Sequence, residues 1–165
     1  MKSLLFLFVL IFPILPALAD ECVFDQENQT KFMTELQSKY KYSKYYKDKR
    51  LLEIVRESKV IRYQRGGCDH FGVKLTLITD DKNDFATRED IFNQVIKLTK
   101  EFWKDGVDGN DVENILRQKK WFRYGETHGQ EVFILQHDHA LVFDFVIIHK
   151  IVNEKHHISI SYYMN

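Results

Sequence analysis

Residues 140–164 read ALVFDFVIIHKIVNEKHHISISYYM, and this stretch decides the fold class. In residues 140–152, apolar side chains occur at both odd and even positions, a pattern typical of an internal strand that is covered on both faces. From His156 to Met164, apolar and polar residues alternate, as in a strand with one buried face. We therefore expect two long strands at the C-terminal end of the chain.

The rest of the chain divides into runs of helix and runs of strand. Helical spacing of apolar residues marks residues 25–40, 87–104 and 110–120. Strand patterns mark residues 51–57, 60–63, 73–77 and 131–136. Because strands and helices do not alternate strictly, we expect an α+β fold. The prediction is a single domain in which two to three helices pack mainly on one face of an antiparallel sheet of about five or six strands.

The first 19 residues have the organisation of a secretory signal peptide. Lys2 is followed by the apolar run Leu4–Leu15 and by the small-x-small pattern of residues 17–19. The apolar run is shorter than the roughly 20 residues that span a bilayer. We expect cleavage after Ala19, which leaves residues 20–165 as one globular domain that is periplasmic or secreted.

The chain contains two cysteines, Cys22 and Cys68. An even and minimal cysteine count behind an export signal favours one disulfide bond between them. Such a bond would remove the thiol of Cys68, which otherwise stands two residues before His70 in the arrangement of an activated nucleophile. We therefore expect a Cys22–Cys68 disulfide rather than a catalytic cysteine.

Charge and motif content exclude several function classes. The chain has 24 lysines and arginines against 24 aspartates and glutamates, so its formal net charge is zero. This balance offers no electrostatic basis for binding nucleic acid or an anionic membrane. After the signal peptide, no run is long and apolar enough to span a membrane. The chain also lacks a nucleophile elbow, a zincin motif, a phosphate-binding glycine loop and a dinucleotide fingerprint, and no cofactor is expected.

Six of the seven histidines lie in the C-terminal part of the chain, and two of them flank Asp138. On a continuous strand His137 and His139 would point to the same face, at a spacing that zinc or copper can use. A third ligand would come from one of three other histidines, namely His128, His149 or His157. The alternative is a hairpin turn at residues 137–138 in which both imidazoles are solvated. Two histidines in a turn are weak evidence for a metal site.

Asp144 is a carboxylate within an otherwise apolar strand. A buried carboxylate has to be paired or must have a raised pKa. It is therefore either a general acid or base in a pocket, or the partner of an arginine or lysine from a neighbouring element. A structural ion pair is the commoner reason for such a residue.

Aromatic and cationic residues are mixed in three segments, around residues 40–47, 62–65 and 121–124. Such mixtures are frequent in protein interfaces. The candidate interface residues are Tyr42, Tyr45, Tyr46, Tyr63, Trp121 and Tyr124.

Together these features favour an exported binding protein that acts on another protein, such as an inhibitor or an immunity-type protein against a secreted enzyme. The alternative is a small periplasmic hydrolase or metal-binding protein that uses the C-terminal histidines and Asp144. Convergence of these groups in one pocket would favour the alternative.

Overall fold

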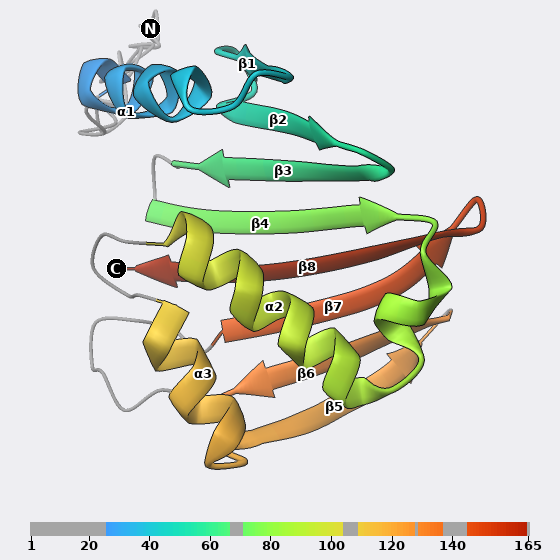
Figure 1. Cartoon of the computed structure of the whole chain (residues 1–165). Coiled ribbons are helices and arrows are strands. Elements are labelled where there is room, and N and C mark those ends of the chain that lie inside the picture. The colour runs from blue at the N-terminus through green and yellow to red at the C-terminus, as the bar shows by residue number, and fades with distance from the viewer. Residues whose placement is uncertain (1–25, 67–70, 104–108, 128, 137–144, 165) are drawn as a thin grey trace, which may run out of the picture.

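A computed structural model of the chain describes residues 26–66, 71–103, 109–127, 129–136 and 145–164 (Figure 1). These residues form three α-helices, one 3-10 helix and eight strands. In chain order the elements are α1 (Gln26–Ser38), β1 (Ser43–Tyr46), β2 (Leu51–Arg56), β3 (Lys59–Arg65), β4 (Phe71–Thr79), η1 (Lys82–Phe85), α2 (Arg88–Phe102), α3 (Gly109–Arg117), β5 (Trp121–Thr127), β6 (Gln130–Leu135), β7 (Phe145–Val152) and β8 (Lys155–Met164).

The eight strands form one antiparallel sheet in the order β1-β2-β3-β4-β8-β7-β6-β5 (Figure 1). The first half of the chain supplies α1 and the meander β1–β4, and the second half supplies α2, α3 and the meander β5–β8. The last strands of the two halves, β4 and β8, pair with each other in the middle of the sheet. Each half of the chain thus supplies helical structure followed by a four-stranded meander, although the sequence shows no internal repeat.

The predicted sheet of about five or six strands was too small. The two strands without a predicted counterpart are β1 and β5, which are the two edge strands of the sheet. Edge strands pair on one side only, and their solvent-facing side chains are often charged, so the alternation of polar and apolar residues is weak in them. Both segments mix aromatic rings with cations, a composition that favours their interpretation as interface residues. The predicted helices and the other strands appear at the expected places.

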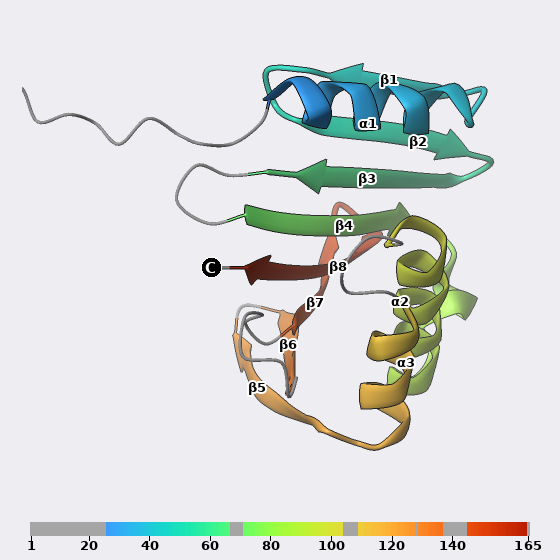
Figure 2. The same ribbon diagram turned by 90° about the vertical axis from the view of Figure 1, so that its left-hand side faces the viewer.

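One face of the sheet carries the core. A row of directly paired residues crosses six strands on this face, and all of its members are at most 2% exposed. The row consists of Leu52, Tyr63, Leu75, Ile160, Ile147 and Phe133. Helices α2 and α3 lie over this face, as Figure 2 shows, and α1 adds Met33 and Leu36 to the same core. All three helices thus contribute to one hydrophobic core.

The opposite face of the sheet is more open. On β7, Phe145 and Ile147 are fully buried on the core face, whereas Val146 and Ile148 on the other face are only half-buried. No helix among the described residues covers this second face. The expectation that this strand is covered on both faces therefore does not hold for its described part, residues 145–152. The preceding residues 140–144 lie outside the described part of the chain.

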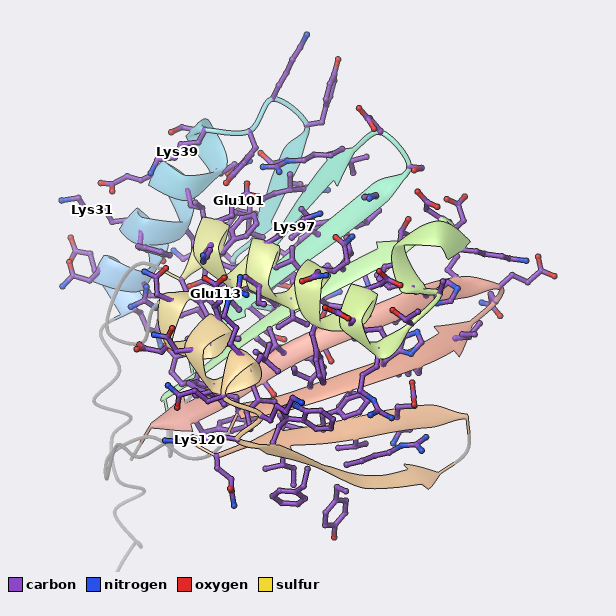
Figure 3. The ribbon with its side chains drawn as sticks, turned by 60° about the horizontal axis from the view of Figure 1, so that its bottom comes forward. Lys31, Lys39, Lys97, Glu101, Glu113 and Lys120 are labelled. Carbon is purple, nitrogen blue, oxygen red and sulfur yellow. The ribbon has the colours of Figure 1, made fainter. Side chains whose placement is uncertain are left out.

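Helices α2 and α3 approach each other closely through a glycine. A Cβ atom on Gly109 would lie 2.2 Å from the backbone nitrogen of Lys100. Glu113 on α3 forms ion pairs with Lys100 on α2 and with Arg117 one turn further along α3, and Figure 3 shows it between the two helices. Hydrogen bonds, first from Lys100 and then from Arg117, lower the pKa of Glu113 below its usual value.

At its other end α2 begins with the predicted capping box of Thr87 and Asp90, which is confirmed.

A charged contact ties the segment that follows α1 to β2 and α2. The hydroxyl of Tyr40 donates a hydrogen bond of 3.0 Å to Oε1 of Glu101, and Arg56 forms a two-pronged ion pair with the same carboxylate. The Arg56 guanidinium also lies 4.8 Å from the centre of the Tyr40 ring. Burial, together with the hydrogen bond and the charge of Glu101, raises the pKa of Tyr40 to about 12.

This contact predicts a late tyrosine titration. The folded state favours the neutral phenol, so the contribution of Tyr40 to stability is complete below pH 10.0, its ordinary pKa, and is lost as the pH rises towards 12. In ¹³C NMR spectra of tyrosine-labelled protein, we expect Tyr40 to remain protonated at about pH 11. Replacing Glu101 with glutamine should lower the pKa of Tyr40, because the carboxylate holds the proton on the phenol. An unchanged titration in this variant would contradict the assignment.

No helix in the described part of the chain has the length and apolar character that a membrane-spanning helix needs.

Candidate functional site

A groove of about 480 Å³ lies where α2, α3 and the start of β5 meet. This volume falls within the range of sites that bind ligands or side chains of a partner. The groove is lined by residues from the N-terminal half of α2, from the end of α3 and the turn after it, and from the first position of β5. The lining residues are Arg88, Glu89, Phe92, Asn93, Ile96, Leu116, Arg117, Lys119 and Trp121.

The floor of this groove is apolar and rests on an aromatic cluster. Phe92 meets Trp121 edge to face at a centroid distance of 5.0 Å, and both rings contact Phe133 in the core. Phe92 and Leu116 are nearly buried, whereas Ile96 and Trp121 are half-buried and still accessible. Edge-to-face packing of three rings holds the indole in a defined position. The floor is therefore a preformed apolar surface.

The rim of the groove is cationic. It carries Arg88, Arg117 and Lys119, whereas Glu89 is the carboxylate among the lining residues and Glu113 on α3 pairs with Arg117. The formal net charge of the whole chain is zero. The guanidinium of Arg88 lies 5.3 Å from the centre of the Trp121 ring and 5.6 Å from that of Phe133. Such cation–π contacts keep the arginine over the floor rather than in bulk solvent. The groove thus combines an apolar floor with a local excess of positive charge.

A second polar constellation lies on the core face, at the end of the sheet near η1. Arg123 donates to Oε1 of Glu131 at 3.0 Å, and Nδ1 of His149 lies 3.4 Å from Oε2 of the same carboxylate. Nε2 of His149 in turn lies 3.0 Å from Nδ1 of His156. These residues form a continuous chain of hydrogen-bonding groups across β5, β6, β7 and β8.

The register of the sheet explains how these polar groups meet. His149 and Glu131 pair directly, and His149 also pairs with Ile158 on the core face. The same cross-strand row continues through Leu77 and Ile61, which are at most 4% exposed. Polar residues therefore occupy the positions that would otherwise complete the apolar core at this end. Their hydrogen bonds to one another offset the cost of burying them.

The aromatic ring of Phe85, from η1, covers both imidazoles. Its centroid lies 4.9 Å from that of His156 and 6.1 Å from that of His149, with ring planes within about 20° of parallel. His156 is 9% exposed. Burial first, and then the charges of His149 and Lys82, lower the pKa of His156 from its ordinary value of 6.5. This imidazole therefore resists protonation in the folded protein.

The histidine pair is not arranged as a metal site. The two ring planes are within 4° of each other and the centroids are 5.3 Å apart, so the facing nitrogens point at one another rather than at a common third point. Among the described residues, no group of three or more histidines, cysteines, aspartates or glutamates has a metal-binding arrangement. The geometry is that of an imidazole–imidazole hydrogen bond.

The predicted interface residues fall on separate parts of the molecule. Tyr42 is 64% exposed, and Tyr45 and Tyr46 lie half-buried on the edge strand β1, with Lys44 and Lys49 over the ring of Tyr46. Trp121 and the exposed Tyr124 lie on β5, the opposite edge strand. These two sets therefore cannot border one groove.

Tyr63 belongs to the core rather than to the surface. It is 2% exposed and packs against the rings of Phe32 and Phe102. Its side chain is therefore unavailable to a partner in this structure. Neighbouring cations at positions 62 and 65 made the segment look like an interface, but the alternation along β3 turns Tyr63 towards the core face.

Several predicted residues lie outside the part of the chain that the structure describes. They are the signal peptide, residues 1–19, both cysteines Cys22 and Cys68, the histidines His128, His137 and His139, and Asp144. Of the histidines proposed as a third metal ligand, His149 lies on the core face of the sheet and His157 on the opposite face.

The sequence contains a signal that both histidines face the core. Extending the alternation of Phe145 and Ile147 by one step places His149 on the core face, and extending that of Ile158 and Ile160 backwards does the same for His156. The contact between them depends on the register of β7 against β8, which the pattern does not contain.

Comparison of the chain with models of known protein families, with curated proteins and with solved structures gave no match.

Proposed function

We propose that this chain is an exported binding protein that recognises another protein through the groove between α2, α3 and β5. The single observation that carries the proposal is the combination of a preformed apolar floor with a cationic rim. An inhibitor or immunity-type role against a secreted enzyme is one form of this function. Export itself rests on the sequence pattern of residues 1–19.

The chemistry of the groove defines the segment that fits it. The half-buried Trp121 and Ile96 offer contact area to one or two large apolar side chains. Arg88, Arg117 and Lys119 favour carboxylates on either side of this anchor. Arginine and tryptophan are also the residues that most often dominate binding energy in protein interfaces. The proposed partner segment is therefore an acidic stretch with an apolar anchor.

The two edges of the sheet differ in a way that supports this choice of surface. Edge strand β1 carries Lys44, and the turn after it carries Lys47 and Lys49; lysines are a common means of preventing association at an exposed edge. Edge strand β5 begins with Trp121 in the groove and carries the exposed rings of Phe122 and Tyr124. The end of the molecule that carries the groove therefore combines the groove with two exposed aromatic rings.

Selection from a phage-displayed library of random linear peptides tests the proposal. We expect the selected peptides to share a large apolar residue flanked by aspartates or glutamates. Reversing two rim charges, in the variant Arg88→Glu/Arg117→Glu, should weaken the selected peptides at least about tenfold, which corresponds to 1.4 kcal/mol. Binding to the unmodified protein should also weaken with added salt.

A matched control reverses the same number of charges at the far edge of the sheet. The variant Lys44→Glu/Lys47→Glu changes β1 and the turn after it, at the end of the sheet opposite to the groove (Figure 1). It should leave peptide affinity within about twofold of that of the unmodified protein, because exposed charges far from a contact are screened at physiological salt. Equal loss in both variants, or selected peptides without acidic residues, would refute the proposed groove.

A further inference from the structure

The contact between His149 and His156 sets a limit on how many protons the pair can hold. Nε2 of His149 and Nδ1 of His156 face each other at 3.0 Å in nearly coplanar rings. One nitrogen must donate and the other must accept, so at least one ring has to be neutral in this geometry. If both rings are imidazolium ions, two N–H groups and two positive charges face each other, and the contact cannot persist.

Different charged groups surround the two rings. Glu131 from β6, itself paired with Arg123 from β5, lies against Nδ1 of His149. His156 faces Lys82 from η1, while its direct neighbour on β4 is the uncharged Thr79. Lys150 and Lys155 instead act on His157, on the opposite face. Protonation of His156 is therefore opposed by burial, by the charge of His149 and by the charge of Lys82.

The histidine pair also supports a segment of the chain. Phe85 is 7% exposed and stacks on both imidazoles, and it anchors η1 to the end of the sheet. Thr87, two residues later, caps α2, and Arg88 and Glu89 of its first turn line the groove. Separation of the two rings would remove the surface on which Phe85 rests.

We propose that the His149–His156 pair is a pH-sensitive switch that holds η1 and the first turn of α2 in place when it carries at most one proton. Acidification adds the second proton, separates the rings and releases Phe85. Because Arg88 lies on the released turn, acid also weakens the groove, a consequence that rests on the proposed function. The switch itself does not depend on any ligand.

Histidine NMR of the full mature protein is the first test. In a titration of the imidazole resonances we expect His156 to titrate below its ordinary pKa of 6.5, because burial and the charge of His149 disfavour its protonated form. Titration of His156 at or above its ordinary pKa of 6.5 would overturn the proposal.

Hydrogen exchange is the second test, and His157→Gln is its matched control. Exchange is measured at about pH 8 and at about pH 5 and corrected for its intrinsic pH dependence. At the lower pH, the amides of residues 82–91 should exchange about tenfold faster relative to those of α3. This factor is the equivalent of one pKa unit. The variant His156→Gln should abolish this change, and His157→Gln should retain it. Unchanged exchange in the unmodified protein, or a change that survives in His156→Gln, would overturn the switch. Neither test uses a peptide, so the outcome of both tests is independent of whether the groove binds peptides.

Discussion

Replacing Phe133 with alanine should reduce the free energy of unfolding by about 3–5 kcal/mol, the usual cost of removing a buried phenylalanine. Phe133 is fully buried in the middle of β6 and contacts the rings of Phe92 and Trp121. Its ring also lies beneath the guanidinium of Arg88. The substitution leaves a cavity under the floor of the groove, and surrounding strands on both sides limit how far the site can collapse. Urea unfolding followed by far-UV circular dichroism measures the loss.

The matched control for Phe133→Ala is Phe122→Ala. Phe122 lies on the neighbouring strand β5 and pairs with Ile134 rather than with the core row. It is 44% exposed, so its removal should cost less than about 1 kcal/mol. Similar losses for the two variants would show that Phe133 does not occupy the packed position described here.

Replacing Gly109 with alanine should cost about 1–3 kcal/mol, because the added methyl group overpacks the contact between α2 and α3. It would lie 2.2 Å from the backbone nitrogen of Lys100 and 2.5 Å from a backbone atom of Thr99. Backbone cannot rotate away as the end of a side chain can, so the two helices have to separate. Both helices line the groove, and this variant should therefore also weaken the peptides selected with the unmodified protein.

Gly125→Ala is the control for this second prediction. A Cβ atom at Gly125 would meet nothing within 4 Å, so the change should alter stability by less than about 0.5 kcal/mol. Thermal unfolding of the two variants and the unmodified protein gives the comparison. A Gly109→Ala variant as stable as the unmodified protein would contradict the close approach of the two helices.

Much of the secondary structure could be predicted because local patterns report it directly. The capping box of Thr87 and Asp90 and the apolar stripe behind it specify α2 without reference to the rest of the chain. Alternation along residues 156–164 identifies the buried face of β8, where Ile158, Ile160 and Tyr162 are at most 3% exposed. These signals are local, since periodicity depends only on which side chains face the core.

The number of strands could not be predicted from the same patterns. Residues 43–46 and 121–127 pair on one side only, and their mixed aromatic and cationic side chains do not alternate strongly. What makes them strands is the hydrogen bonding offered by β2 and β6, which comes from other parts of the chain. Tertiary pairing, rather than local preference, decides edge strands.

The candidate sites show the same division between local sequence and tertiary structure. The sequence by itself determined that Trp121 has cationic neighbours along the chain. The alternation along the two strands also determined that His149 and His156 occupy core-facing positions. Only the tertiary structure decided that Trp121 meets Arg88, 33 positions earlier by residue number, and that the two imidazoles face each other at 3.0 Å. The physical reason is that a strand's face follows from alternation along the chain, whereas contacts between strands and helices follow from register and packing, which balance free energies over the whole core.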